Sequence, residues 1–216
     1  MLILAVDGAL GPLTAAVLDS QTGEAWVEAA AQRDALEGGL RAADTALRAS
    51  GHALRDLRRL AVTIGPGRFT GLRIALAYAK SLAFALNVPL IGVSSYDAVA
   101  TAGLGEPALV AVRGRAGAAC VRLRLGNGGD EQFSGAIDEV AGWVRSRAAG
   151  LELAAVGALD ELAPALLRAG VSFARLAQGE PPALRAAHIA AAAVPHEGAH
   201  GVRPDYGERP HTTVPR

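Results

Sequence analysis

Three groups of residues have types and spacings that could support chemistry. Asp7 ends an apolar run at the N-terminus, and the acid of a phosphate or metal–phosphate site often stands at such a strand end in α/β proteins. Gly65-Pro66-Gly67 and Thr70-Gly71 lead into a helical segment whose first N–H groups could hold an anion, with Arg68 nearby. His196-Glu197-Gly198-Ala199-His200 matches the zinc-peptidase pattern H-E-x-x-H.

Each group also has a purely structural explanation. The glycine-rich turn lacks the Gly-Lys-Ser/Thr ending of a P-loop, so a tight turn with Thr70 as the helix N-cap is favoured. A strand-end turn that accepts backbone hydrogen bonds explains Asp7 at least as well. Pro195 and the nearby glycines disfavour the helix that would place both imidazoles on one face. We therefore predict no catalytic residue, no metal site and no cofactor, and keep a candidate nucleotide- or anion-binding set of Asp7, Gly65, Gly67 and Thr70.

The composition limits the classes of partner. The chain has 216 residues, is 51% hydrophobic, and balances 21 Lys and Arg against 21 Asp and Glu. A neutral chain with 4% aromatic residues lacks the basic field and the stacking surface that bind RNA tightly. Cys120 is the single cysteine, so no intrachain disulfide can form. Because the N-terminus starts with a strand-like segment and no basic leader, we expect no signal peptide and a cytoplasmic location.

The elements that must position these residues follow a regular order in the N-terminal half. Apolar runs predict strands at Leu2–Val6, Thr14–Asp19, Glu24–Ala29, Leu60–Ile64 and Pro89–Val93. Apolar residues at helical spacing predict helices at Ala35–Ser50 and Leu72–Leu86. The first three strands should form an antiparallel meander, and the last two should form a right-handed parallel βαβ unit. The resulting order, β-β-β-α-β-α-β, is that of each half of the actin-like, sugar-kinase-like α/β fold.

The pattern starts again after a boundary rich in glycine and proline at 103–107. Further strands are predicted at Ala108–Arg113, Cys120–Leu125, weakly near Gln132-Phe133, and at Leu151–Val156 and Val171–Leu176. Helices are predicted between and after them, at Ile137–Ala148, Leu159–Arg168 and Pro182–Val194. The order of elements indicates a reduced copy of the first half. We therefore predict an N-terminal half over residues 1–103 and a smaller second half over 104–181, followed by a helix and a tail over 182–216.

The helix predicted at Leu72–Leu86 is apolar on every face, which is typical of a helix buried all round. A chain of this size has little material for its second face, so either a protein partner or a central core position would explain the pattern. Gly71, Ala75 and Ala79 lie on one face, where small side chains would let another backbone approach. A membrane span is disfavoured, because Lys80 interrupts a stretch that would need about 20 apolar residues.

The segment from Ile64 to Ala100 resembles the signature of the bacterial TsaB (YeaZ) family of threonylcarbamoyladenosine biosynthesis. The family's GPGSFTGLR corresponds to Gly65–Arg73, with Arg68 in place of serine. The N-terminal LILAVDGALGPLTAAVLD is similar to the family's strand, acidic turn and strand, with Asp7-Gly8-Ala9 in place of Asp-Thr-Ser. Two later segments are also similar: Ala111–Arg115, with Arg113 in place of an acid, and Pro204-Asp205-Tyr206, which matches a terminal Pro-x-Tyr.

The resemblance implies two actin-like halves, with residues 182–216 packing back on the first half. It also implies a non-catalytic subunit that binds the TsaD transferase through the two helices of its N-terminal half, that works with TsaE, and that contacts tRNA only indirectly and no membrane. Without TsaD, the same apolar surface should form a homodimer. The predicted interface residues are Leu36, Leu40, Ala43, Leu47, Arg68, Phe69, Leu72, Ala75, Leu76, Ala79 and Ala83. The rival hypothesis is an ATP-dependent phosphotransferase of the actin-like superfamily. Such an enzyme would need a second acidic turn about where this chain has Arg113, which disfavours that hypothesis.

Overall fold

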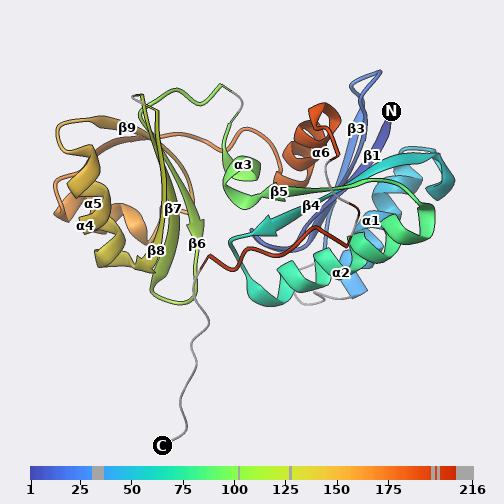
Figure 1. Ribbon diagram of the computed structural model, residues 1–216, viewed down its shortest axis with the longest axis horizontal. Coiled ribbons are helices and arrows are strands. Elements are labelled where there is room, and N and C mark those ends of the chain that lie inside the picture. Colours follow the sequence, from blue (N-terminus) through green and yellow to red (C-terminus); the bar gives the residue numbers. More distant parts are fainter. Residues whose placement is uncertain (31–36, 102, 127, 196–197, 199, 208–216) are drawn as a thin grey trace, which may run out of the picture.

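The chain folds into two halves that lie side by side, each built on one five-stranded mixed sheet (Figure 1). The computed structural model describes residues 1–30, 37–101, 103–126, 128–195, 198 and 200–207, with the backbone alone at 37–40. Residues 182–195 and 200–206 follow the second half in sequence but lie against the first half, where a helix packs on its sheet and an extended segment lies beside Ile64 and Gly92.

The first half consists of an antiparallel meander followed by two parallel strands. Its strands are β1 (Leu2–Asp7), β2 (Thr14–Asp19), β3 (Ala25–Ala29), β4 (Leu57–Gly65) and β5 (Leu90–Ser94), in the spatial order β3-β2-β1-β4-β5. β1 pairs antiparallel with β2 and parallel with β4, and β5 extends the parallel part. Helices α1 (Glu37–Ala49) and α2 (Phe69–Leu86) cover one face of this sheet. The other face is covered by α3 (Ser95–Val99) and α6 (Pro182–Ala192), and a short 3-10 turn at Leu54–Asp56 precedes β4.

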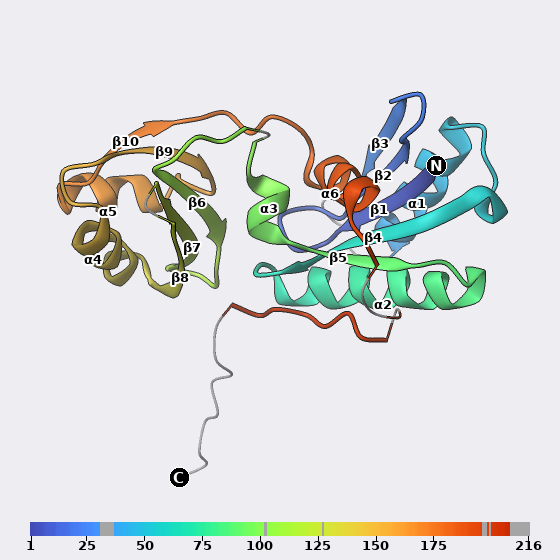
Figure 2. The same ribbon diagram turned by 45° about the horizontal axis from the view of Figure 1, so that its top comes forward.

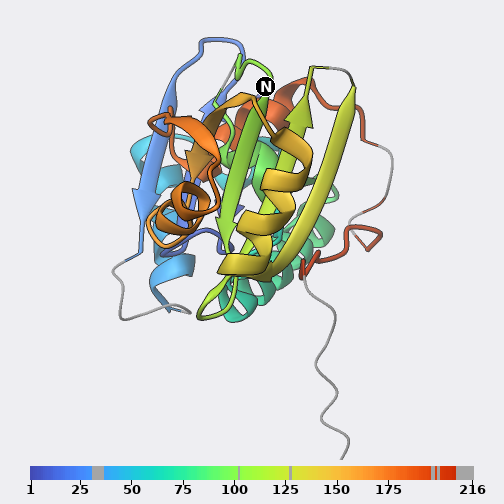
Figure 3. The ribbon, with the colours of Figure 1, turned by 90° about the vertical axis from the view of Figure 1, so that its left-hand side faces the viewer.

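The second half repeats this arrangement. Its strands are β6 (Ala108–Arg113), β7 (Ala118–Leu125), β8 (Gly129–Ala136), β9 (Glu152–Gly157) and β10 (Ser172–Arg175), in the order β10-β9-β6-β7-β8. Helices α4 (Ile137–Ala148) and α5 (Leu162–Arg168) pack on the outer face of this sheet (Figure 3). In each half the first strand is central, the meander lies on one side of it and the parallel strands lie on the other. This duplication confirms the predicted actin-like, sugar-kinase-like fold.

Several element boundaries differ from the predictions for identifiable reasons. β4 begins at Leu57, three residues before the predicted start at Leu60. The charged Arg59 fits into the strand because its guanidinium donates hydrogen bonds to the carbonyl oxygens of Ala190 and Ala193. α2 begins at Phe69, so Thr70 lies inside the helix and Arg68 takes the N-cap position without a side-chain hydrogen bond. The prediction that Thr70 caps this helix is therefore wrong.

The start of α2 rests directly on the turn that follows β1. A Cβ atom added to Gly71 would lie 2.1 Å from the carbonyl oxygen of Gly8, and one added to Gly8 would lie 2.2 Å from the carbonyl oxygen of Gly71. Only glycine at both positions permits this approach of two backbones. The small-residue face of Gly71, Ala75 and Ala79 was expected to admit another backbone, and the backbone it admits is the chain's own.

The two halves are joined through α3 and the inner face of the second sheet. Tyr96 of α3 is buried with Val112 of β6 and Cys120 of β7, and burial raises the pKa of its phenol. Beside this cluster, the guanidinium of Arg122 on β7 donates to Asp97 of α3 at 2.7 Å and to Asp130 of β8 at 2.6 Å. These contacts connect the two halves.

α2 is the one helix, among the residues that the structure describes, whose length and composition would suffice to cross a membrane. Its apolar character has a simpler explanation in the fold, because Leu72, Ala75, Leu76, Ala79 and Ala83 pack against the first sheet.

A candidate partner surface and the cleft between the halves

The rest of the chain covers only part of the outward face of α2. Phe69, Arg73, Ala77, Ser81 and Phe84 follow one another at intervals of four, four, four and three residues, so they form one row on the helix, here named the outer row. The two aromatic residues at its ends are strongly exposed, Phe69 at 56% and Phe84 at 72%. Arg73 and two small residues, Ala77 and Ser81, lie between them, so the centre of the row carries little side-chain bulk.

An extended segment at residues 200–206, here named the tail strap, runs along one flank of α2 (Figure 2). Its Val202 is only 8% exposed and belongs to the core of the first half, and the N–H of Asp205 donates to the carbonyl oxygen of Ile64 at 2.6 Å. The ring of Tyr206 lies 5.1 Å from that of Phe69, and the ring of His200 lies 5.7 Å from that of Phe84. Each exposed phenylalanine of the outer row is therefore met by a ring of the strap.

The predicted interface residues divide into two groups in the structure. Arg68 and Phe69 are exposed, as residues that contact a partner must be. The other described side chains are between 0% and 6% exposed and pack on the chain's own sheet: Ala43, Leu47, Leu72, Ala75, Leu76, Ala79 and Ala83. A side chain that is buried within its own chain cannot contact a partner, so the prediction of these residues as contact residues is corrected. Leu36 and the side chain of Leu40 lie outside the described part of the chain.

The resemblance implied that residues 182–216 pack back on the first half, but the sequence reasoning did not assign the rings of this tail to α2. A valine in a polar segment, with His200 before it and Tyr206 after it, was the available signal. That signal is weak, because a single apolar residue in an extended segment has no periodicity to indicate what it packs on.

A cavity of about 350 Å³ lies between the two halves. The first half contributes Asp7, Thr14 and Arg68 to its walls, and the second half contributes Arg113 and Asp160. The cavity occupies the cleft where the rival hypothesis would place a nucleotide.

Asp7 is buried at the inner wall of this cavity and is already hydrogen-bonded. Its Oδ1 accepts from the hydroxyl of Thr63 and from the N–H of Ala9, the latter at 3.0 Å. Burial, partly offset by these bonds, raises the pKa of the carboxyl. The residue therefore fixes the turn after β1, which is the structural role that the sequence left open for it.

The other members of the predicted anion-binding set do not join Asp7 at the cavity. A Cβ on Gly65 would lie 1.9 Å from the carbonyl oxygen of Asp205, and a Cβ on Gly67 would lie 2.3 Å from that of Ala9. Both glycines are thus pressed against the chain's own backbone. Thr70 is exposed in the first turn of α2 and does not line the cavity either. The structure separates the set into one cavity-wall residue, two glycines of the turn and one residue in the first turn of α2.

Arg113 stands at the end of β6, where an actin-like ATPase would have its second acidic turn. Its guanidinium lies 3.5 Å from Glu161. The neighbouring Asp160 accepts a hydrogen bond from Arg175, which lowers the pKa of that carboxyl. The carboxylates on this side of the cleft are thus paired with arginines of the second half.

The H-E-x-x-H motif cannot be followed through the structure, since His196, Glu197 and Ala199 lie outside the described residues. His200, which is described, packs its ring on Phe84. Among the residues that the structure describes, no group of three or more His, Cys, Asp or Glu side chains lies close enough to hold a metal ion.

The sequence and the fold together define the class of protein. Residues 27–196 match the family described as tRNA N6-adenosine threonylcarbamoyltransferase, TsaD. Because the match covers more than half of the chain, the chain belongs to this family. Within it, the chain is a member of the TsaB (YeaZ) group. It is 37% identical over 95 residues to the tRNA threonylcarbamoyladenosine biosynthesis protein TsaB of Escherichia coli K12, which covers 44% of this chain and 41% of that protein.

Two further relatives define the extent of the similarity. A tRNA N6-adenosine threonylcarbamoyltransferase of Moorella thermoacetica is 54% identical over 48 residues, or 22% of this chain and 14% of that protein. The structure of YeaZ from Pseudomonas aeruginosa superposes with a TM-score of 0.70 at 25% identity and covers 95% of this chain and 99% of that chain. The sequence matches to these TsaB and transferase relatives thus span 41% and 14% of their length, whereas the fold of the YeaZ structure is shared over 99% of its chain.

Proposed function

We propose that this chain is a non-catalytic subunit in tRNA threonylcarbamoyladenosine biosynthesis, and that it binds the TsaD transferase through the outer row of α2. The observation that carries the proposal is the exposure of Phe69 and Phe84 on a helix that the chain itself covers on its other faces. Burial of one such ring contributes about 2 kcal/mol to association. A surface of this kind is typical of a protein–protein interface.

The family relationship supports TsaD as the occupant. The sequence is similar both to proteins named TsaB and to proteins named threonylcarbamoyltransferase, so this chain and TsaD are variants of one type of fold. Two such proteins can pair through equivalent helices, as the two copies in an isologous dimer do. A homodimer through the same face, in the absence of TsaD, belongs to the same proposal, as does the later addition of TsaE.

The cleft supports a non-catalytic role for this subunit. Asp7 is engaged by Thr63 and Ala9, and the opposite turn carries Arg113 where a second acid would be needed for phosphoryl transfer. The zero net charge supports an indirect relation to tRNA, because tight RNA binding generally needs a basic surface. A cytoplasmic location away from membranes completes the proposal.

The test compares two substitutions of exposed helical alanines. Ala77→Glu places a carboxylate in the centre of the outer row, while Ala192→Glu makes the same change at an exposed position of α6. Ala79→Glu is unsuitable for this purpose, because Ala79 is fully buried against the sheet and a charge there would unfold the protein. Affinity for the TsaD of the same organism is measured by titration, and folding is checked by thermal unfolding.

We expect Ala77→Glu to weaken TsaD binding by about a hundredfold, since a longer, charged side chain in place of a methyl group both overpacks the contact and must be desolvated there. Ala192→Glu should bind like the unsubstituted chain. Undiminished binding by a folded Ala77→Glu variant would exclude the outer row as the interface. An ATPase assay on the isolated chain tests the rival hypothesis, and turnover above background would contradict a non-catalytic role.

A further inference from the structure

The tail strap matches the outer row of α2 in length. Phe69 and Phe84 are 15 residues apart, which corresponds to roughly 22 Å along a helix axis. Tyr206 and His200, whose rings meet these two phenylalanines, are six residues apart, and a fully extended chain of that length spans at most about 22 Å. The strap therefore runs antiparallel to α2 with little slack between its two ring contacts.

The backbone on both sides of Tyr206 is fixed by contacts with the rest of the chain. Asp205 donates its N–H to the carbonyl oxygen of Ile64 at 2.6 Å, and its Oδ1 accepts from the N–H of Gly207 at 2.8 Å. A Cβ atom added to Gly207 would lie only 2.6 Å from the Cβ atom of Pro66, so this residue is pressed against the turn that precedes α2. Tyr206 therefore lies between two anchored residues.

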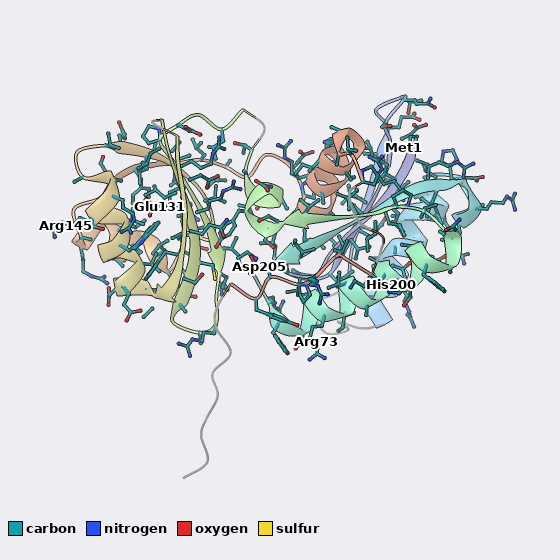
Figure 4. The ribbon with its side chains drawn as sticks, in the orientation of Figure 1. Met1, Arg73, Glu131, Arg145, His200 and Asp205 are labelled. Atoms are coloured by element: carbon teal, nitrogen blue, oxygen red, sulfur yellow. The ribbon has the colours of Figure 1, made fainter. Side chains whose placement is uncertain are left out.

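The strap is also attached in its middle and at its other end. Val202 is only 8% exposed and packs in the core of the first half. The carbonyl oxygen of His200 accepts from Nζ of Lys80 at 3.4 Å, and its ring centre is 5.7 Å from that of Phe84. Figure 4 shows His200 and Asp205 at well separated points along α2. These attachments define the position of the strap along the helix.

The ring of Phe69 has neighbours within the chain that restrict it and still leave it accessible. Its centre is 5.1 Å from that of Tyr206 at an interplanar angle of 35°, a separation typical of favourable aromatic pairs. The guanidinium of Arg73 lies 5.2 Å from the same ring centre. Phe69 nevertheless remains 56% exposed and Tyr206 40% exposed. An aromatic ring that is fixed in place and open to solvent is prepared for contact with a partner.

We propose that the tail strap is a positioning element of the partner site, in which Tyr206 holds the ring of Phe69 in the orientation that TsaD covers. The proposal rests on the proposed function, because it assumes that the outer row of α2 contacts TsaD. It goes further by naming a residue outside α2 on which that contact depends. A side chain that is free to rotate loses this freedom when a partner fixes it, which weakens binding, whereas a side chain fixed beforehand avoids the loss.

The test compares the removal of the tyrosine ring with its conservative replacement. Tyr206→Ala removes the ring that meets Phe69 and should weaken TsaD binding by about fivefold to tenfold. Tyr206→Phe keeps the ring and should bind within about twofold of the unsubstituted chain. Leu167→Ala provides the control, because it removes a 66% exposed apolar side chain from α5, at the far end of the second half (Figure 1). Titration measures the affinities, and thermal unfolding verifies that all variants are folded.

A double-mutant cycle distinguishes positioning of Phe69 from an independent contribution of Tyr206. Phe69→Ala is prepared alone and in combination with Tyr206→Ala. If Tyr206 acts through Phe69, the second substitution should weaken TsaD binding by less than about twofold once the phenylalanine ring is absent. Full additivity of the two losses would overturn the inference, because Tyr206 would then act without Phe69.

The outcomes separate this inference from the proposed function. If Ala77→Glu weakens TsaD binding while Tyr206→Ala lowers only the thermal stability, the interface is in the right place and the positioning role of the strap is wrong. Equal losses of affinity in Tyr206→Ala and Tyr206→Phe would also contradict the inference, since they would assign the effect to the hydroxyl group. If the unsubstituted chain does not bind TsaD, both proposals are overturned.

Discussion

At the scale of single residues, Asp7 shows how a side chain in a typical phosphate-site position can have a structural role. Its carboxyl is 1% exposed and connects three parts of the first half, namely β1, the turn at Ala9 and Thr63 of β4. That turn supports the start of α2, so the residue contributes to the proposed interface only through the position of the helix.

The raised pKa of Asp7 predicts a specific pH dependence of stability. Because burial raises the folded-state pKa above its ordinary value of 3.8, the folded protein holds this proton more tightly than the unfolded chain. The contribution is therefore fully present below the unfolded pKa and is lost as the pH rises through the folded pKa. Asp7→Asn removes this titration while it retains an oxygen that accepts from Ala9.

The measurement is urea unfolding of both proteins at intervals between about pH 4.5 and pH 8.5. We expect the free energy of unfolding of Asp7→Asn, relative to that of the unsubstituted chain, to increase with pH. Titrations of other groups cancel in this difference. A difference that stays constant or decreases with pH would show that the carboxyl is not penalised by burial.

At the scale of elements, the close backbone contact between the start of α2 and the turn after β1 positions α2 on the sheet. Gly8 and Gly71 approach so closely that neither has room for a Cβ atom. The glycine-rich segment before α2 thus has a steric reason for its composition. An anion site is not needed to explain it.

A comparison of two helical glycines tests the contact between Gly8 and Gly71. Gly71→Ala should destabilise the protein by roughly 2 kcal/mol or more, because the new methyl group would overlap the carbonyl group of Gly8. Gly142 lies inside α4, and a Cβ atom added there would meet no atom within 4 Å, so Gly142→Ala should stabilise the protein by about 0.5–1 kcal/mol. Chemical unfolding measures both. Equal effects of the two substitutions would exclude a tight contact at Gly71.

The elements also show what the sequence can and cannot predict. The order of strands and helices, and the bounds of β2, β6 and α4, follow from local apolar patterns and are confirmed. β8 was predicted only weakly, because a sheet-edge strand with no fully buried residue has little apolar pattern. The burial of Ala79 and Ala83 could not be predicted, since α2 is apolar on all faces and its periodicity does not identify the side that meets the sheet.

The tail strap illustrates a second limit. Val202 packs on the core of the first half, more than a hundred residues from Ile64 and Gly92 in sequence. No local pattern encodes such a contact. The sequence alone therefore left two explanations for the apolar helix, a protein partner or a core position, and could not show which of its faces the chain itself covers.

At the scale of the whole molecule, two actin-like halves are in contact, with a small cavity between them and an incompletely covered helix on one side. Arg122 links Asp97 to Asp130 across the halves, and Tyr96 is buried between them. The contacts between the halves leave Phe69 and Phe84 of the outer row exposed. This exposed row is the surface that we propose for binding another subunit.

The central claim, that the outer row of α2 is covered by a second subunit, can be tested by thiol labelling. Ala77→Cys places a reactive group in the centre of the row, and the native Cys120 is only 1% exposed, so a maleimide should modify the new thiol selectively. Ala192→Cys on α6 provides the control. The labelling rate is measured with and without saturating TsaD.

We expect TsaD to slow the labelling of Ala77→Cys by about tenfold or more, because a buried thiol is inaccessible to the reagent. The rate at Ala192→Cys should not change. Complex formation is verified by size-exclusion chromatography of the labelled samples. A complex in which the thiol of Ala77→Cys is modified as fast as in the free chain would contradict the account.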